Sequence, residues 1–182
     1  MIDASDFITA CIARGYTFYT GVPCSFLKPL INFIIQTPAI HYVPASSEGE
    51  AVGIASGAFL GGKRAVVLCQ NSGLGNMVNP ITSLNFAFRI PLLLVITLRG
   101  APGLNDEPQH EVMGRITPRL LETLGIAWDY FPNSNDKIEP ALDQAITNMK
   151  KTRVPFALVM QKGAVGKIAL DSQSDSRKWN QN

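Results

Sequence analysis

Short apolar runs rich in β-branched residues alternate with helical segments along most of the sequence, and this alternation limits the fold more than any single motif does. Strands are predicted at residues 16–20, 40–44, 64–69, 90–98, 127–131 and 154–161. Helices are predicted at residues 3–14, 25–36, 48–59, 77–88, 114–124 and 136–151. Because strands joined through helices run parallel with right-handed crossovers, we predict an α/β fold: a three-layer, doubly wound and mostly parallel sheet with helices on both faces.

The composition fits one domain with part of its surface covered. The chain has 182 residues, of which 46% are hydrophobic and 16% are charged, whereas typical soluble domains carry roughly 25% charged residues. This deficit favours either a partner chain over part of the surface or a large core, and we expect an oligomer. We predict a domain at residues 1–165, followed by a polar tail or linker at residues 166–182.

Charge, apolar runs and cysteines argue against several classes of protein. The net charge of +2, without a basic run, gives no reason to expect a nucleic-acid partner. The longest apolar run, residues 90–96, is far shorter than the roughly 20 residues of a membrane span, and the acidic start lacks the layout of a secretory signal. Cys11, Cys24 and Cys69 lack the spacing of metal or redox sites, so we expect a reducing cytoplasm, no disulfide framework and no metal ligands on this chain.

The segment at residues 46–59 begins a helix and leaves one acid without a structural task. Ser47 and Glu50, three residues apart, form the pattern of a capping box, so Glu50 already serves the helix start. Glu48 falls at the first helical position without such a task. Glycines recur at four-residue spacing from Gly53 to Gly61. Since an interior glycine costs about 1 kcal/mol relative to alanine in a helix, this stripe indicates that something approaches the helix backbone closely.

Three loop segments are expected at one edge of the sheet. Residues 21–25, 46–48 and 70–76 each follow a predicted strand, and ligands of doubly wound sheets bind beyond the carboxyl ends of the strands. Residues 99–112 show no periodicity and make a natural cover for the same edge. We therefore expect the functional site there.

Other sequence features suggest sites of other types. The glycine turn at residues 73–76 lacks the third glycine of a dinucleotide fingerprint and the Gly-Lys-Ser/Thr of a P-loop, so a plain turn explains it at least as well. Ser72 does not lie in a nucleophile elbow, and His41 lies in a strand as a core or edge histidine. For the polar loop that contains His110, two interpretations stay open. Its acidic residues are simply exposed to solvent, or the loop is a lid that brings His110 and Arg115 to an anionic substrate.

Four strings of residues occur in one order along the chain. They are Gly-Val-Pro-Cys-Ser-Phe-Leu at 21–27, Glu-Gly-Glu-Ala at 48–51, Gln-Asn-Ser-Gly-Leu-Gly-Asn at 70–76 and Asp-Glu-Pro-Gln-His at 106–110. On these strings the chain resembles the pyrimidine-binding domain of thiamine diphosphate enzymes, in the phosphonopyruvate and sulfopyruvate decarboxylase group. The resemblance covers roughly residues 3–163. The seven-residue string is specific, whereas the Glu-x-x-Ala element is specific only in this context.

The resemblance implies a cofactor site around Glu48. In that family the matching glutamate hydrogen-bonds N1′ of the aminopyrimidine of thiamine diphosphate, which prepares the cofactor to decarboxylate a 2-oxo acid. The catalytic role therefore falls to Glu48. The resemblance implies that the cofactor is bordered by Pro23, Glu48, Asn71, Gly73, Leu74 and Asn76. It also implies that the acidic groups of a small anionic 2-oxo acid are met by Ser25, Asn71, His110 and Arg115.

One family motif is missing from the sequence. The family binds Mg²⁺ and the diphosphate through Gly-Asp-Gly in a second domain, and no Gly-Asp-Gly occurs here. The resemblance therefore implies half an active site, completed by a diphosphate-binding domain or β subunit, in a homo- or hetero-oligomer. We expect conversion of phosphonopyruvate to phosphonoacetaldehyde and CO2, with the alpha subunit of sulfopyruvate decarboxylase, which forms sulfoacetaldehyde and CO2, as the alternative. A non-catalytic binding or regulatory module of the same fold is a third hypothesis, against which Glu48 argues.

Overall fold

The structure, a computed structural model, describes residues 1–170 and contains a six-stranded sheet in which every strand runs parallel to its neighbours. The strands are β1 (Tyr16–Gly21), β2 (His41–Pro44), β3 (Arg64–Gln70), β4 (Leu93–Thr97), β5 (Ala127–Tyr130) and β6 (Phe156–Met160). Their order in the sheet is β2-β1-β3-β4-β6-β5. The chain extends the sheet first to one side of β1 and then to the other, which is a doubly wound topology.

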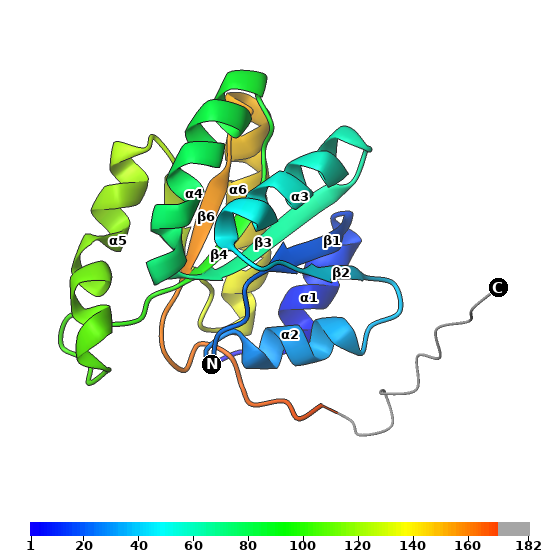
Figure 1. The fold of residues 1–182 in the computed structure, drawn as a ribbon. Coiled ribbons are helices and arrows are strands. Elements are labelled where there is room, and N and C mark those ends of the chain that lie inside the picture. The colour runs from blue at the N-terminus through cyan, green and yellow to red at the C-terminus, as the bar shows by residue number, and fades with distance from the viewer. Residues whose placement is uncertain (171–182) are drawn as a thin grey trace.

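Helices cover both faces of this sheet (Figure 1). They are α1 (Ala4–Ala13), α2 (Lys28–Ile35), α3 (Glu48–Leu60), α4 (Leu74–Pro80), α5 (Glu111–Thr123) and α6 (Ile138–Thr152). Side chains of α1, α2 and α6 pack in one core with one face of the sheet, and side chains of α3, α4 and α5 pack in a second core with the other face. The sheet is therefore the middle of three layers, and the predicted fold class is confirmed.

The central strands are apolar on both faces because both faces are covered. In β3, Val66 and Leu68 belong to the core with α1, α2 and α6, whereas Val67 and Cys69 belong to the core with α3, α4 and α5. Side chains alternate along a strand, so a continuous apolar run is what such a strand requires. Strand β2 differs because it lies at the edge of the sheet, and its side chains, His41 among them, are mostly exposed.

The predicted start of α2 is wrong. The helix begins at Lys28 rather than at Ser25, because the preceding residues form a turn in which N of Leu27 donates to the carbonyl O of Cys24 at 3.1 Å. Pro29 lies in the first turn of the helix, where its missing N–H costs no hydrogen bond. Ser25 therefore does not cap this helix.

The predicted start of α5 is also wrong. The helix begins at Glu111 rather than at Gly114, after a 3₁₀ turn at Pro108–His110. Gly114 marks a close contact instead: a Cβ there would lie 1.7 Å from the carbonyl O of Gly100. The glycine is required by packing between the loop after β4 and α5, and it does not mark a helix end.

Pro80 changes the helix that follows β3, as expected from the sequence. Helix α4 ends at Pro80 and continues as a π-helical segment, Ile81–Phe86. Since proline has no N–H, it cannot bond to the carbonyl O of Asn76 four residues earlier. That carbonyl faces Gly49 of α3, where a Cβ would lie 3.0 Å away from it. The irregularity therefore coincides with a close approach of α4 to the first turn of α3.

After β6 the chain returns along the N-terminus and α2. Ile2 and Val165 form an isolated parallel bridge, and Nδ2 of Asn32 donates to the carbonyl O of Ile168 at 2.7 Å. Residues 171–182 of the predicted polar tail lie outside the described residues, and the domain boundary at residue 165 stays a prediction. Within residues 1–170, no helix is long and apolar enough to cross a membrane.

Candidate active site

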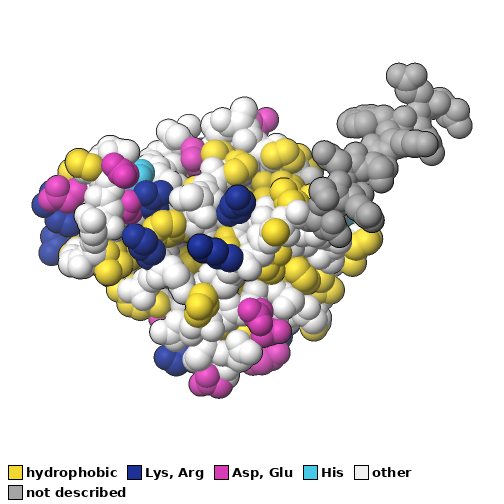
Figure 2. Space-filling view, turned by 90° about the horizontal axis from the view of Figure 1, so that it is seen from below, with side chains coloured by type: hydrophobic (Ala, Val, Ile, Leu, Met, Phe, Trp, Pro, Cys, Tyr) yellow, Lys and Arg dark blue, Asp and Glu magenta, His cyan; other side chains and the backbone are white. Residues whose placement is uncertain are grey.

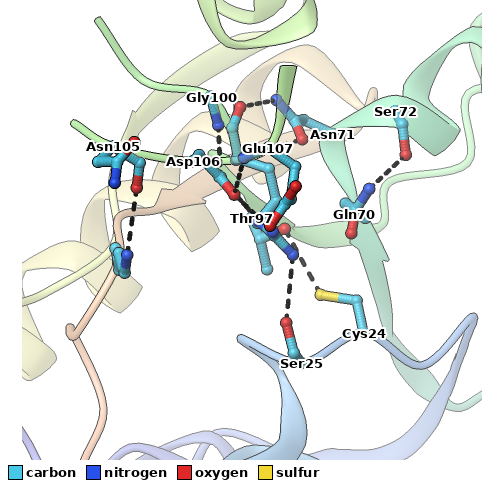
Figure 3. Close-up of polar contacts among 12 residues, drawn as sticks. Cys24, Ser25, Gln70, Asn71, Ser72, Thr97, Gly100, Asn105, Asp106 and Glu107 are labelled. Atoms are coloured by element: carbon cyan, nitrogen blue, oxygen red, sulfur yellow. Dashed lines mark hydrogen bonds and ion pairs between the residues drawn. The ribbon is translucent and has the colours of Figure 1, made fainter. Parts of the chain in front are cut away.

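The carboxyl ends of the strands meet at one edge of the sheet, at the bottom of Figure 1. Seen from below, this side of the molecule carries a group of Lys and Arg side chains (Figure 2). Figure 3 shows three segments converging here: Cys24 and Ser25 follow β1, Gln70 ends β3 with Asn71 directly after it, and Asp106 follows β4. Two of the three segments that the sequence places at this edge, residues 21–25 and 70–76, therefore lie together with the loop after β4.

Glu48 is the first residue of α3 and is largely buried, with 9% of its surface exposed. Nδ2 of Asn76 donates to its Oε2 at 2.8 Å, whereas no residue of the described chain donates to its Oε1. Gly73 lies against the carboxyl group, since a Cβ there would be 2.2 Å from Oε1. The structure thus brings together three of the predicted cofactor contacts and leaves one carboxylate oxygen available.

The cap of α3 fixes the backbone at Glu48. Oγ of Ser47 accepts from N of Glu50 at 3.2 Å, which is the first half of the predicted capping box. The Glu50 carboxylate accepts from N of Ser46 at 2.7 Å, so the reciprocal bond is made one residue before the cap. Hydrogen bonds from Ser46 lower the pKa of Glu50, and an ionised carboxylate is favourable at a helix N-terminus. Glu50 therefore serves the cap, and Glu48 is free for other chemistry.

Cys69 is a fully buried thiol near the end of β3. Burial raises the pKa of the Cys69 thiol, and the charges of Glu48 and Cys24 raise it further. The thiol donates to Sδ of Met77 at 3.5 Å. A protonated, buried thiol is not a nucleophile.

Asn71 is fully buried, and its amide is engaged within the chain. Nδ2 donates to the carbonyl O of Arg99 at 2.9 Å and to Oγ1 of Thr117 at 3.1 Å. Oδ1 accepts from N of Arg99 at 3.3 Å. The amide thereby holds the loop after β4 and helix α5 against the end of β3. A contact of Asn71 with cofactor or substrate stays a prediction.

The remaining predicted contacts lie around this edge without a hydrogen bond to Glu48 in the described chain. Leu74 is fully buried in the core beside α3, and Pro23 is exposed in the loop after β1. Nη1 of Arg115 donates to Oε1 of Glu111 one turn earlier at 3.1 Å, with 57% of the arginine side chain exposed. The His110 side chain is partly exposed before α5. The ligand contacts of these residues stay predictions.

Arg99 and Asp106 form an ion pair that sequence reasoning missed. Nε of Arg99 donates to Oδ2 of Asp106 at 2.7 Å and Nη2 donates to Oδ1 at 2.5 Å, with only 14% and 10% of the two side chains exposed. Nη1 donates to Oγ of Ser25 at 3.2 Å. The guanidinium lies 4.6 Å from the centre of the Phe26 ring, in the geometry of a cation–π contact. Arg99 therefore joins the loops after β1 and β4.

The ion pair between Arg99 and Asp106 favours the ionised form of both side chains. The hydrogen bonds to Asp106 raise the pKa of Arg99, and the same bonds hold the pKa of Asp106 well below its usual range. Asp106 also accepts from N of Gly100 at 2.8 Å and from N of Glu107 at 2.9 Å. Bidentate arginine–carboxylate pairs are the strong and geometrically specific ones, so Asp106 is a fixed anion of the loop.

The loop after β4 is anchored along its length. Nζ of Lys162 donates to the carbonyl O of Asn105 at 3.3 Å. At Gly100, where φ is +68°, a Cβ would lie 2.1 Å from the carbonyl O of His110. Because Asp106 is paired rather than solvated and the backbone is held from two sides, residues 99–107 form a fixed wall of the site in this structure.

One signal could have identified Arg99 from the sequence. It follows the last residue of β4 by two positions, and a charged residue directly beyond a buried parallel strand lies at the edge where ligands bind. Its partners could not be identified in that way. The same holds for Thr97, whose Oγ1 lies 3.6 Å from Sγ of Cys24 (Figure 3).

The available oxygen of Glu48 defines what this edge can do chemically. A largely buried carboxylate with one oxygen held by Asn76 can use the other oxygen to bind a ring nitrogen of a ligand and to exchange a proton with it. In the part of the chain that the structure describes, no group of three His, Cys, Asp or Glu side chains could hold a metal ion. The open carboxyl oxygen of Glu48 therefore suits a ligand that brings a hydrogen-bond donor to it.

Comparisons with known proteins point to such a ligand. The family described as thiamine pyrophosphate enzyme, N-terminal TPP binding domain, matches residues 2–117. A phosphonopyruvate decarboxylase of Streptomyces viridochromogenes is 42% identical over 165 residues, which are 91% of this chain and 42% of that protein. The sulfopyruvate decarboxylase subunit alpha of Methanococcus maripaludis is 34% identical over 152 residues, which are 83% of this chain and 89% of that protein.

A solved structure shares the fold. It is the thiamine diphosphate-dependent 4-hydroxybenzoylformate decarboxylase of Rhodococcus jostii RHA1, with a TM-score of 0.66 and 16% identity over 92% of this chain and 32% of that chain. The chain thus spans less than half of the phosphonopyruvate decarboxylase and most of the alpha subunit.

Proposed function

The chain belongs to the thiamine pyrophosphate enzyme family as an N-terminal TPP-binding domain, and from this premise we propose that it forms the pyrimidine-binding half of a thiamine diphosphate-dependent 2-oxo acid decarboxylase. The observation that carries the proposal is the Glu48 carboxyl group, buried at a helix start with Oε1 available. When bound, thiamine diphosphate supplies the electron sink for loss of CO2 from the substrate. Glu48 would hold the ring by a hydrogen bond at N1′ and share a proton with that atom.

The residues around Glu48 fit the aminopyrimidine ring of this cofactor. Asn76 engages only Oε2, so the carboxyl group is oriented while Oε1 stays open. Gly73 leaves the flank of the carboxyl group without a side chain. Asn71 would act by holding the neighbouring loop. We assign the cofactor contacts to Pro23, Glu48, Asn71, Gly73, Leu74 and Asn76.

The comparisons support two substrates unequally. Two phosphonopyruvate decarboxylases of Streptomyces are 42% and 39% identical to the chain, which favours conversion of phosphonopyruvate to phosphonoacetaldehyde and CO2. The alternative is sulfopyruvate, because the chain spans 89% and 83% of two sulfopyruvate decarboxylase alpha subunits. Either substrate is a small anionic 2-oxo acid, and its acidic groups are assigned to Ser25, His110 and Arg115, with Asn71 acting through the loop that its amide holds.

A partner would complete the active site. Mg²⁺ and the diphosphate are assigned to a diphosphate-binding domain or β subunit, because the sequence contains no Gly-Asp-Gly. The glycine stripe of α3 supports a covered surface, since a Cβ at Gly53 or Gly57 would meet no described atom within 4 Å. Close packing against the stripe would therefore come from a partner. The free thiols of Cys11, Cys24 and Cys69 fit a reducing cytoplasm.

Reconstitution tests this proposal. The chain would be assayed alone and together with a Gly-Asp-Gly partner, thiamine diphosphate and Mg²⁺, with phosphonopyruvate and sulfopyruvate in parallel and aldehyde formation as the readout. We expect turnover only in the complex, and the ratio of the two rates identifies the substrate. Turnover by the chain alone would contradict the half-site, and no turnover of either acid by the complex would contradict the decarboxylase.

A further inference from the structure

We propose that Arg99 and Ser25 form an anion subsite that receives the phosphonate or sulfonate group at C3 of the 2-oxo acid. The identity of this ligand rests on the proposed function. The subsite is built from the loops after β1 and β4, which meet where Nη1 of Arg99 donates to Oγ of Ser25 at 3.2 Å.

Both residues keep donors for an anion. Arg99 uses Nε and Nη2 on Asp106 and Nη1 on Ser25, so one hydrogen on each Nη atom remains without a partner among residues 1–170. Because Ser25 accepts from Arg99, its own hydroxyl hydrogen is free to donate. An oxyanion beside Nη1 and Oγ would therefore receive a charge-assisted hydrogen bond from the guanidinium and a second hydrogen bond from the hydroxyl.

The guanidinium is held in place before a ligand arrives. Asp106 fixes its plane through two hydrogen bonds, and the Phe26 ring lies beneath it at 4.6 Å. An arginine fixed in this way loses little rotamer freedom on binding, which favours affinity and geometric specificity. Asp106 is fully engaged by N–H groups, so its charge is already compensated by donors of the loop.

Further positive charge lies on the other side of Ser25. A hollow of about 550 Å³ is lined by Ser25, Lys28, Asn32, Lys167 and neighbouring residues. Neither Lys28 nor Lys167 forms an ion pair within residues 1–170. Such a field attracts a substrate with two or more negative charges toward Ser25 and Arg99.

A purely structural role for the ion pair makes a different prediction. If Arg99 only anchors the loop after β4, its loss disturbs every substrate equally, whether or not the substrate carries a charge at C3. If Arg99 binds the anion, its loss affects phosphonopyruvate and sulfopyruvate but spares pyruvate, which has no charged group at C3. The ratio of the effects on charged and uncharged acids therefore decides between the two roles.

The experiment uses the enzyme reconstituted with its diphosphate-binding partner. We expect Arg99→Gln to raise KM for phosphonopyruvate or sulfopyruvate by roughly 10- to 100-fold, because charge-assisted hydrogen bonds are lost, and to change KM for pyruvate by less than about threefold. Arg99→Lys would recover part of the loss for the charged acids. Arg119→Gln removes one exposed charge from α5 and serves as the matched control, with KM unchanged. An equal loss for pyruvate and phosphonopyruvate would overturn the subsite.

A binding measurement keeps this proposal separate from the proposed function. By calorimetry, 3-phosphonopropionate, which lacks the 2-oxo group and cannot react, should bind the wild-type complex and bind Arg99→Gln roughly 10- to 100-fold more weakly. Ser25→Ala, at an exposed position that is safe for folding, should weaken it about 3- to 10-fold. If binding is weakened in this way but no 2-oxo acid is turned over, the proposed decarboxylase activity is contradicted and the anion subsite is supported. If a 2-oxo acid is turned over but neither variant weakens binding of 3-phosphonopropionate, only the anion subsite is contradicted.

Discussion

The corner of the site around Glu48 and the corner around Arg99 are assembled over very different separations along the chain. At Glu48, the cap comes from Ser47 one residue earlier, and one turn at residues 73–76 supplies both the glycine and the amide that touch the carboxyl group. At Arg99, the hydroxyl that meets the guanidinium belongs to Ser25, 74 residues away. Capping therefore fixes the backbone at Glu48, but its contact with Asn76, 28 residues away, needs α3 packed against α4. Asp106 lies only seven residues from Arg99, whereas the contact with Ser25 exists only once the sheet is assembled.

Sequence motifs identify the first corner, whereas the second corner is recognised only from contacts in the structure. The Glu48 corner contains the family strings at residues 48–51 and 70–76, and it is the proposed cofactor end of the site. The strings at residues 21–27 and 106–110 supply the partners of Arg99, but Arg99 itself lies in none of the four. The Arg99 corner is the proposed substrate end, and its contacts are visible only in three dimensions (Figure 3). A motif can thus indicate the chemistry of an enzyme, while the residues that select its substrate come from long-range packing.

Glu48→Gln would have the largest effect and isolates the chemistry of the first corner. Glutamine keeps the size of the side chain but cannot share a proton with a ring nitrogen, so we expect kcat of the reconstituted enzyme to fall about 10²- to 10⁴-fold. Thermal unfolding should be nearly unchanged, which would show that the loss is chemical. Decarboxylation at the wild-type rate would instead favour a non-catalytic module of the same fold.

Gly73→Ala tests whether the turn positions the Glu48 carboxyl group. The new Cβ would lie 2.2 Å from Oε1, so the carboxyl group must move; we expect roughly 10- to 100-fold lower activity and about 1–3 kcal/mol lower free energy of unfolding. Gly75→Ala is the matched control, because a Cβ there would meet no described atom within 4 Å. If both variants behaved alike in assays and urea unfolding, the turn would not set the position of Glu48.

Asp106→Asn probes the second corner through pH. The folded-state pKa of Asp106 lies below its usual range, so its ionised form stabilises the fold above the unfolded value of about 3.9, and this contribution is lost as pH falls from there toward the lower folded value. We expect the variant to lower the free energy of unfolding by about 1–3 kcal/mol near neutral pH. Urea unfolding at about pH 7, 5 and 3 should show this difference shrinking at the lowest pH. A difference that stays constant would mean that the ion pair is not its source.

Ser47→Ala has the smallest expected effect and tests how local the first corner is. Loss of the hydroxyl that accepts from N of Glu50 should lower the free energy of unfolding by about 1 kcal/mol. Ser25→Ala, compared by the same thermal unfolding experiment, should change it by less than about 0.5 kcal/mol, because that serine caps no helix and its hydrogen bond with Arg99 is exposed to solvent, where water can replace the hydroxyl. Equal effects of the two substitutions would show that the local cap contributes nothing particular.

Periodicity and turn chemistry were sufficient for most of the fold. The apolar run at residues 64–69 predicts a strand buried on both faces, and β3, which extends one residue further to Gln70, is such a strand. Ser25 shows where local rules fail. It is a good capping residue, but its hydroxyl accepts from Arg99 of a distant loop, and α2 begins at Lys28 without it. A tertiary hydrogen bond took the place of the cap.

The candidate site could be predicted only as far as its local part. Glu48 stands out because the cap accounts for Glu50 and leaves the first acid without a task. Asn71 lies in a specific string of residues, yet its amide donates its hydrogen bonds to Arg99 and Thr117 within the chain. The spacing of these residues in the sequence does not predict these hydrogen bonds, because they depend on the distance between neighbouring strand ends.

The glycine stripe of α3 has a consequence for how the chain exists outside a complex. Each of Gly53 and Gly57 lowers the stability of the helix by about 1 kcal/mol relative to alanine, and both are exposed in the described chain. When a partner covers them, no side-chain rotamers are frozen, so association loses little entropy there. If the proposed partner covers this stripe, the uncovered chain would be the form more prone to unfolding and degradation, and its amount in the cell would follow the amount of that partner.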